Sequence, residues 1–370
     1  MKVGLVGCGV AVEHHLPGLL SVPGREVVLC DTDEQKMERL AQRVGAKNSY
    51  SDFKDMLRAE KPDAVHIMTP PKTHADLSMM AAGAGSHILV EKPMAMTVEE
   101  CELMIEAARK NKVSLCVMHN HLFDPMLHRA RQMIRDGELG DIVSVECQYC
   151  LDEDKMAEEK LDQPEHWAHD LPLGIFGEYT PHLLYLILPF IGPVVDVQAS
   201  RREIQATRGA IPGLNVGLNG QQAFGHLLML TRMPYAHFQL HIYGTRKALH
   251  INMMDLTMTV KRELRLPKTA ARMTSTLEQS LQSVWGLGTN TLKILSGRLK
   301  RRPGHLALIT GFYESLQANS APPVSGEEGR EVVRAIELIH QTLKTKFEVY
   351  ESKRGSSTAP GFAQAEAGRS

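Results

Sequence analysis

The chain has 370 residues, of which 43% are hydrophobic and 23% charged, and its formal net charge is -1. This length is more than one ordinary core accommodates, so we expect two globular domains. The near-zero charge provides no global basic field, which argues against nucleic acid or an anionic membrane as a partner. The basic run GRLKRRPGH at 297–305 lacks interleaved aromatic residues and is interpreted as a solvated loop, with a phosphate-bearing substrate as the alternative.

The N-terminal run KVGLVG at 2–7 is strand-like from its first residue, which leaves no room for a secretory signal peptide. No apolar run approaches the roughly 18 residues that a membrane span requires. The six cysteines are scattered without the density of a disulfide framework, as is usual in a reducing compartment. We therefore expect a cytoplasmic protein.

Strands and helices alternate at short spacing over the first third of the chain. The apolar, β-branched runs that predict strands are KVGLVG (2–7), EVVLCD (26–31), AVHIMT (64–69), HILVEK (87–92) and SLCVMH (114–119). Helical patterns lie between them, at 33–45, 73–85 and 97–112. Nearly continuous apolarity in the strands indicates a parallel sheet covered on both faces. We predict a doubly wound Rossmann α/β domain over residues 1–122.

A glycine-rich turn follows the first predicted strand directly. Gly7 allows a tight turn, and Gly9 allows the backbone to approach a pyrophosphate held at the N-terminus of the next helix. The third position of the dinucleotide fingerprint is usually small but is Val12 here. The candidate cofactor-binding residues of this turn are Gly7, Cys8, Gly9, Val10 and Ala11.

The second predicted strand ends in Asp31, about the right distance downstream to accept hydrogen bonds from a ribose diol. Its carboxylate would repel a 2′-phosphate and no arginine follows it at once, so we expect NAD rather than NADP. Asp31 could also cap the following helix, and the two roles are compatible.

Two further stretches stand at the same predicted sheet edge, where ligands bind in such folds. TPPKTH contributes Thr69, Pro70, Pro71 and His74, and EKP contributes Glu91 and Lys92, as further candidates for the cofactor site. A lysine at this edge can also stabilise a substrate oxygen as charge develops on it. A surface lysine before a helix-starting proline is the alternative for Lys92.

The pattern changes after residue 122. A helix is predicted at 124–140, and strands without intervening helices follow at 141–150, 194–203, 223–232, 236–245 and 248–262. They predict an open, mostly antiparallel sheet in an α+β domain over 123–348, with two closing helices at 304–319 and 327–346. Residues 262–305 are interpreted as an insertion or lid, and 349–370 have the composition of a disordered tail.

Cys147 and Cys150 form a CxxC within the β-forming run IVSVECQYC at 142–150. Residues three apart on a strand point to opposite faces, so the two thiols would not converge. No second CxxC exists to complete a zinc site. We predict structural cysteines.

His119 and His121 form a HxH that could ligate a metal, but no third ligand lies nearby, so no metal site is predicted.

GCG, Asp31, TPPKTH and EKP, in that order, resemble the glucose-fructose oxidoreductase/inositol dehydrogenase (Gfo/Idh/MocA) family, and the resemblance runs from Lys2 to about Lys346. It implies a Rossmann domain with bound NAD(P) and a second domain built on an open antiparallel sheet. It also implies hydride transfer at a secondary alcohol of a sugar, sugar derivative or cyclitol. Many members form dimers or tetramers through the sheet, so we expect a homodimer or homotetramer.

The stretch GEYTPHLLYL at 177–186 matches the family's catalytic helix, usually DxGxHxxD. His182 is retained, whereas Glu178, Thr180 and Tyr185 replace the leading aspartate, the glycine and the trailing aspartate. By the same resemblance Lys92 is the catalytic lysine, Pro93 is often cis, and Asn120 lines the substrate side of the nicotinamide.

The predicted centre has His182 as acid/base, Lys92 as its electrostatic or proton-relay partner, and Glu178 as support from the same helix face. Asn120, Trp167 and Tyr185 are the candidate substrate-binding residues, with the Trp167 indole either against a sugar ring or in the core. Two alternatives remain open. The fold could serve a non-catalytic NAD(P)-binding regulator, or it could use NAD transiently for elimination or glycoside cleavage without net redox change.

Overall fold

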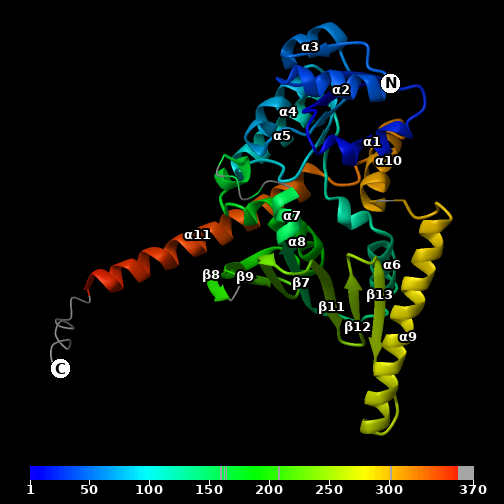
Figure 1. Ribbon diagram of the computed structural model, residues 1–370, viewed down its shortest axis with the longest axis vertical. Helices are drawn as coiled ribbons and strands as arrows, with labels where there is room; N and C mark the ends of the chain where they lie inside the picture. Colours follow the sequence, from blue (N-terminus) through cyan, green and yellow to red (C-terminus); the bar gives the residue numbers. More distant parts are fainter. Residues whose placement is uncertain (159–160, 162, 164, 207–208, 301, 357–370) are drawn as a thin grey trace, which may run out of the picture.

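The structure is a computed structural model, and it describes residues 1–158, 161, 163, 165–206, 209–300 and 302–356. It contains two sheets, one in each half of the chain, with the N-terminal α/β part at the top of Figure 1 and the second sheet below it. Within the described residues, no helix combines the length and the apolarity needed to cross a membrane.

The N-terminal sheet has six parallel strands in the order β3-β2-β1-β4-β5-β6. The strands are β1 (Lys2–Val6), β2 (Glu26–Cys30), β3 (Ser49–Tyr50), β4 (Ala64–Ile67), β5 (His87–Val90) and β6 (Leu115–Val117). The helices between them are α1 (Val12–Leu20), α2 (Glu34–Val44), α3 (Phe53–Glu60), α4 (His74–Gly83) and α5 (Val98–Asn111). The predicted Rossmann arrangement is confirmed, and the two-residue strand β3 is added to it.

Local sequence explains where these helices begin. The side chains of Asp33, Asp52 and Thr97 cap α2, α3 and α5 by accepting hydrogen bonds from backbone N–H groups of the first turn. Because Asp33 is the cap of α2, Asp31 does not serve as that cap. The Asp31 carboxylate is therefore available to the glycine turn.

The second sheet has seven strands in the order β13-β12-β11-β7-β10-β9-β8. They are β7 (Ile142–Asp152), β8 (Val194–Ala206), β9 (Gly209–Gly220), β10 (Phe224–Met233), β11 (His237–Gly244), β12 (Lys247–Asn252) and β13 (Thr257–Arg262). All neighbours pair antiparallel except β10 and β7, which are parallel. The predicted open, mostly antiparallel sheet is confirmed.

Helices cover one face of this sheet. They are α7 (Glu153–Glu158), α8 (Phe176–Ile191) and α11 (Gly326–Ser356), whereas α6 (Pro125–Arg135) and α10 (Pro303–Gln317) lead to and from the junction between the sheets. Residues of β10 and β11 alternate between buried and half-buried, so the opposite face is left partly open.

Three segments differ from the sequence-based expectations. Strand β9 was not predicted, because its four glycines and Pro212 are residues that strands normally lack. The segment 262–305, interpreted from the sequence as an insertion or lid, contains the unpredicted helix α9 (Lys268–Leu295), which lies along β13. Helix α11 continues through 349–356, within the segment predicted to be disordered, and 357–370 lie outside the described residues.

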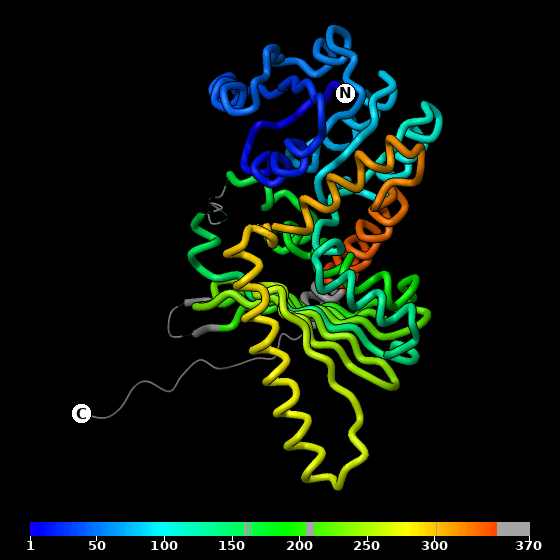
Figure 2. Tube along the Cα trace, turned by 90° about the vertical axis from the view of Figure 1, so that its right-hand side faces the viewer, coloured from blue at the N-terminus to red at the C-terminus, as the bar shows by residue number. Residues whose placement is uncertain are grey.

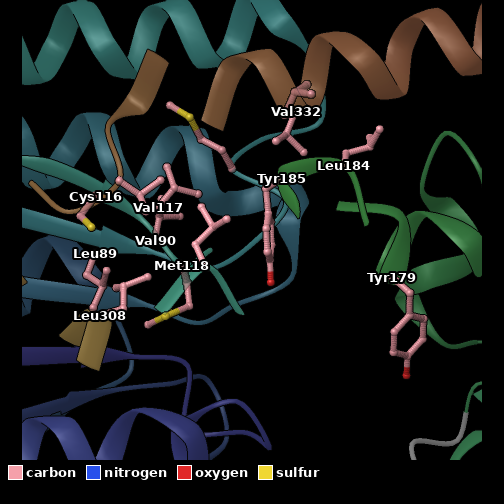
Figure 3. Close-up of a cluster of buried hydrophobic side chains, with 14 of the residues drawn as sticks. Leu89, Val90, Cys116, Val117, Met118, Tyr179, Leu184, Tyr185, Leu308 and Val332 are labelled. Atoms are coloured by element: carbon pink, nitrogen blue, oxygen red, sulfur yellow. The ribbon is translucent and has the colours of Figure 1, made fainter. Parts of the chain in front are cut away.

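One continuous core joins both halves. Figure 3 shows Leu89, Val117 and Met118 of the parallel sheet and its edge beside Tyr185 of α8 and Leu308 of α10. All of these side chains are at most 1% exposed. In Figure 2, α10 runs back to the N-terminal half, and a Cβ at Gly18 of α1 would lie 2.6 Å from Ile309 Cβ. Helix α10 therefore packs against α1 of the N-terminal half, and α11 packs against α8.

Candidate active site

The glycine turn after β1 combines one position that the fold requires to be glycine with one that it does not. Gly7 has φ +91°, and a Cβ there would lie 2.9 Å from the Met68 carbonyl carbon. Gly9 has no atom within 4 Å of the place its Cβ would occupy. Since packing does not explain the glycine at position 9, the open space above it fits the close approach of a pyrophosphate.

The N-terminus of α1 completes this cradle. Ala11 occupies the cap position and offers no side-chain hydrogen bond, and Val10 beside it is 77% exposed. Helical bonding begins where Val12 N–H donates to Gly9 O at 3.3 Å. Glu13 and His14 N–H continue this tight first turn by donating to the carbonyl oxygens of Val10 and Ala11, and the dipole of α1 favours an anion at this end of the helix.

Asp31 shapes the same turn. Its Oδ2 accepts a hydrogen bond from Cys8 N–H at 2.6 Å, and its Oδ1 accepts one from Asp33 N–H at 2.9 Å. The carboxylate remains partly exposed at the end of β2. Val12 is 2% exposed and packs into the core, so the larger residue at the third fingerprint position is accommodated beneath the turn. The residues of this region fit a bound dinucleotide.

The TPPKTH loop is tied to the EKP loop by a buried histidine. His74 is fully buried, and its ring nitrogens lie 2.7 Å from Thr69 O and 3.0 Å from Pro93 O. Pro71 starts the short helix η1 (Pro71–Thr73). His74 therefore connects the two loops from the interior and does not face the ligand side, whereas Thr69 is partly exposed and Pro70 is exposed.

Behind the EKP loop lies a buried chain of polar side chains that sequence reasoning missed. Tyr313 OH lies 2.6 Å from His66 Nε2, the Nδ1 atoms of His66 and His15 are 2.9 Å apart, and His15 Nε2 lies 2.9 Å from Glu91 Oε1. Two neutral histidines satisfy every contact if Tyr313 donates to His66, His66 donates to His15, and His15 donates to Glu91. Burial opposes ionisation of Glu91, but the hydrogen bond from His15 and nearby positive charge lower its pKa to about 2.

This series of hydrogen-bonded side chains positions Lys92. Glu91 Oε2 accepts a hydrogen bond from Lys92 N–H at 3.1 Å, and the following peptide bond to Pro93 is cis, as the resemblance implied. The sequence signal for the chain was His66, a lone imidazole inside the otherwise apolar strand AVHI. Its partners could not be found by spacing, because Tyr313 is 247 residues away.

Lys92 reaches helix α8. Its Nζ donates to Glu178 Oε1 at 2.5 Å and to Glu178 O at 3.0 Å. The Lys92 and Glu178 side chains are 11% and 17% exposed, so the pair is screened only in part by solvent. The structure thus brings together two residues that lie 86 positions apart in the sequence.

His182 lies one turn further along α8 and is held by Tyr185. The Tyr185 hydroxyl is 2.6 Å from His182 Nδ1 and 3.2 Å from Asn120 Oδ1. Since Asn120 Oδ1 can only accept, the tyrosine proton points to it and His182 Nδ1–H donates to the tyrosine oxygen. Nε2 of His182 then carries a lone pair, and the ring remains partly exposed.

The surroundings keep this imidazole neutral. Burial lowers the pKa of His182 well below its ordinary value, and the positive charge of Lys92 and the neighbouring His121 add to the effect. The Tyr185 ring, 1% exposed, stacks on His119 with centroids 4.5 Å apart. Burial raises the pKa of the Tyr185 hydroxyl well above its ordinary value, so it acts as a neutral hydrogen-bonding group.

A second histidine at the site was considered at the sequence level only as a metal ligand. His121 Nδ1 lies 2.8 Å from Asp124 Oδ2, and the His121 ring meets the His182 ring edge-on at 5.2 Å. Asp124 Oδ1 also accepts a hydrogen bond from Gly304 N–H at 3.1 Å, at the start of α10. In the sequence, the three-residue spacing of His121 and Asp124 in HNHLFD could have predicted this contact.

Trp167 lies on a separate short helix, η3 (Trp167–Asp170), where it is partly buried with its ring 5.2 Å from the His166 ring. Lys72 Nζ and Asp170 Oδ2 form an ion pair at 2.7 Å, which joins this helix to the TPPKTH loop. Helix η3 is therefore joined to the loop that borders the cradle, although Trp167 is not part of the hydrogen-bonded cluster around His182.

All six cysteines are free and buried, Cys147 and Cys150 included. Both thiols of this CxxC lie in the interior of the protein. Among the described residues, no group of three or more His, Cys, Asp or Glu side chains is arranged to hold a metal ion.

The fold, together with the side chains around His182, indicates a class of protein. A phosphate-binding turn after β1, with an acidic residue after β2 and a lysine, a neutral histidine and a tyrosine converging at the same sheet edge, is typical of a two-domain, dinucleotide-dependent oxidoreductase.

Comparisons with known proteins identify the family. Residues 1–119 match the model described as "Oxidoreductase family, NAD-binding Rossmann fold", and residues 127–250 match the "GFO/IDH/MocA C-terminal domain". The chain is 32% identical over 339 residues to 1,5-anhydro-D-fructose reductase of Ensifer adhaerens, covering 88% of this chain and 91% of that protein. The chain belongs to the Gfo/Idh/MocA family of oxidoreductases, and its N-terminal domain is an NAD-binding Rossmann domain.

Other relatives match over shorter stretches. D-apiose dehydrogenase of Paraburkholderia graminis is 34% identical over 140 residues, which cover 38% of this chain and only 37% of that protein. A dehydrogenase from Chromobacterium violaceum has a similar fold, with a TM-score of 0.76 at 19% identity over 96% of this chain and 98% of that one.

Proposed function

We propose that the chain is an NAD-dependent oxidoreductase that transfers a hydride between nicotinamide and a CH–OH group of a sugar, sugar derivative or cyclitol. The observation that carries this proposal is the convergence of Lys92, Glu178, His182 and Tyr185 at the sheet edge that also holds the glycine turn. A protein that only bound NAD would have no need for a lysine and a neutral histidine at that place.

When bound, NAD supplies the hydride acceptor, and the side chains of this chain handle the proton. The Nε2 lone pair of His182 takes the hydroxyl proton of an alcohol, since Nδ1–H is held by Tyr185. The ammonium of Lys92 stabilises the oxygen on which negative charge develops, and Glu178 fixes the ammonium in place. In the reverse direction the protonated His182 returns the proton to the alkoxide.

The substrate class rests on two supports. Two relatives carry sugar-type names, D-apiose dehydrogenase and 1,5-anhydro-D-fructose reductase. Trp167 lies on η3, the helix joined to the TPPKTH loop by Asp170 and Lys72, and an indole gives an apolar face suited to a sugar ring; Asn120 offers an amide beside Tyr185. We assign Asn120 and Trp167 to substrate binding, whereas Tyr185 acts through His182.

The cofactor residues follow from the cradle. Gly7, Cys8, Gly9, Val10 and Ala11 would surround the pyrophosphate, and the exposed edge of Asp31 would meet the ribose. Because that carboxylate repels a 2′-phosphate, NAD is preferred over NADP. We further propose a cytoplasmic location and assembly into a homodimer or homotetramer through the partly open face of the second sheet.

The test is a panel of sugars, anhydrosugars, cyclitols and their keto forms, with the absorbance of reduced nicotinamide followed in both directions. At least one compound is expected to oxidise NADH or reduce NAD. His182→Ala and Lys92→Met should each lower turnover by roughly 100-fold or more while NADH still binds. Lys110→Met is the matched control, since this lysine is exposed on α5, away from the His182 cluster.

Near-normal turnover of His182→Ala would contradict the assignment of the base. Two other outcomes would replace the proposal. Binding of NADH without consumption of any compound would favour a non-catalytic regulator. Conversion of a glycoside with no net change in nicotinamide would favour transient use of NAD in an elimination.

A further inference from the structure

A cavity of about 360 Å³ lies between the start of α8, strands β8 and β9, and helix α11, and we call it the α8–α11 pocket. Strand β8 forms one edge of the second sheet, and α11 lies across it beside α8 (Figure 1). The described residues that line the pocket include none from the glycine turn and none from the cluster around His182. The volume falls within the range of about 300–1,000 Å³ that is usual for small-molecule sites.

The floor of the pocket is apolar. Leu173, Phe176 and Leu214 are at most 4% exposed, and Leu343 of α11 is half-buried at its side. Leucine and phenylalanine side chains offer no hydrogen bond to a ligand. The floor therefore favours a ligand with an apolar body, because contact with it removes apolar surface from water.

The rim of the pocket is basic. Arg201 stands directly opposite Leu214 in the register of β8 and β9, so both side chains lie on the same face of the sheet. His340 and Lys344 are four residues apart on α11 and share one side of that helix. Among the lining residues that the structure describes, none is acidic.

The guanidinium of Arg201 is held at the pocket by an aromatic contact. Its central carbon lies 5.2 Å from the centroid of the Phe176 ring. A cation placed over a ring face is attracted by the ring, which keeps this charge beside the apolar floor. The planar guanidinium can still form paired hydrogen bonds with a carboxylate.

The floor and the rim together select one kind of ligand. An apolar body fits the floor, and a negatively charged group fits the rim. Sugars and cyclitols have neither a large apolar body nor a negative charge, so this pocket does not duplicate the substrate site proposed around His182.

We propose that the α8–α11 pocket binds a small organic anion with an apolar body, such as an arylacetate, while NADH occupies the cofactor site. Phe176 is the first residue of α8, and Glu178 in the same turn contacts Lys92. The ligand therefore contacts the turn that carries Glu178 and leaves the cofactor cradle free.

The first experiment titrates 4-fluorophenylacetate into the full chain and follows the fluorine NMR signal, with and without an excess of NADH. Binding should be saturable, with the same affinity in both conditions. The neutral analogue 4-fluorophenylacetamide has nearly the same shape but no charge. It should bind about 10-fold more weakly, because it loses the charge-assisted hydrogen bonds at the rim.

The second experiment repeats the titration with variants of the rim. Arg201→Met and Lys344→Met should each weaken binding of 4-fluorophenylacetate by about 10-fold. Arg202→Met is the matched control, since Arg202 is also exposed but is the next residue on β8 and points to the opposite face of the sheet. Its affinity should equal that of the wild type.

A third variant fills the pocket. Leu343→Trp adds a large ring at the side of the floor and should abolish binding of 4-fluorophenylacetate. The circular dichroism spectrum and NADH binding show whether this variant is folded. If it is not, the rim variants still decide the proposal, because their substitutions lie at exposed positions.

The proposal is wrong if 4-fluorophenylacetate shows no saturable binding at millimolar concentrations. Equal affinity for the acetamide would contradict the preference for an anion. Equal weakening by Arg201→Met and Arg202→Met would place the ligand outside the pocket, and loss of binding when NADH is added would place it in the cofactor site. None of these readouts depends on turnover, so failure here leaves the proposed activity untouched.

Discussion

The Tyr185 hydroxyl accepts a hydrogen bond from His182 Nδ1–H and donates one to Asn120 Oδ1. Its ring stacks on the ring of His119. The family usually has an aspartate at this position, and a carboxylate there would favour an imidazolium. The neutral phenol of Tyr185 orients the His182 imidazole without favouring its protonated form. The substitution therefore sets the protonation state of the proposed base while keeping its orientation.

Replacing Tyr185 by Phe keeps the buried volume but removes the oxygen that orients His182. We expect turnover to fall by about 10- to 100-fold, as for other groups that orient a catalytic side chain, with NADH binding unchanged. The pH dependence of turnover should also change, because His182 Nδ1 loses its partner. Tyr243→Phe on the open sheet face is the control. An unchanged pH profile in Tyr185→Phe would reduce the tyrosine to a packing role.

At the scale of elements, the parallel sheet and the glycine turn were predictable because their signals are local. Apolar runs followed by glycines and an aspartate define strand, turn and helix within a few dozen residues. Strand β9 was missed because pairing with both neighbours overrides the poor strand propensity of Gly213 and Pro212. The series of side-chain hydrogen bonds from Tyr313 to Glu91 was missed because it forms only when α10 packs on α1.

The same distinction explains what was found at the site. Lys92 and His182 could be proposed from motifs, whereas the ion pair of Lys92 with Glu178 and the contact of His182 with Tyr185 depend on how α8 packs against the sheet. The segment 262–305 was interpreted as a lid from its polar composition. Its helix directs Gln282 at β13, a contact that composition alone could not predict.

The glycine turn gives a prediction at this scale. Gly9→Ala should leave the melting temperature unchanged, because a Cβ there meets nothing, but it should weaken NADH binding by filling the cradle. Gly7→Ala should lower the free energy of unfolding by about 1–3 kcal/mol through its positive φ and its contact with Met68. Thermal melts and NADH fluorescence titrations measure both effects.

Gly83→Ala is the control for Gly9, since this exposed glycine also has open space and an ordinary φ. If Gly9→Ala binds NADH as tightly as the wild type and Gly83→Ala, the pyrophosphate does not lie over Gly9.

At the scale of the whole molecule, several buried imidazoles make stability depend on pH. Burial lowers the pKa of His119 and of His305 to about 3 and that of His66 well below its ordinary value. These folded-state values lie below the unfolded value near 6.5, so the unfolded chain takes up protons that the folded chain does not. The stabilising contribution is complete above about pH 6.5 and is lost as the pH falls.

For a histidine with a folded pKa near 3, the loss between pH 7 and pH 5 is about 2 kcal/mol. We expect urea unfolding curves to show decreasing stability over this window, with a slope of at least two protons. His305→Asn should reduce the slope by about one proton, whereas replacement of the exposed His128 should leave it unchanged. A stability that stays flat from pH 7 to pH 5 would show that these imidazoles are solvated.

The central claim is that hydride passes directly between substrate and nicotinamide while His182 handles the proton. The most direct measurement uses a substrate from the panel with deuterium on its carbinol carbon and analyses the nicotinamide by mass spectrometry after a single turnover. The wild-type protein should yield reduced nicotinamide that is heavier by one deuterium, and His182→Ala should yield none while still binding NADH. Product formation with the deuterium released to water or retained in the product, and none left on the nicotinamide, would contradict the account.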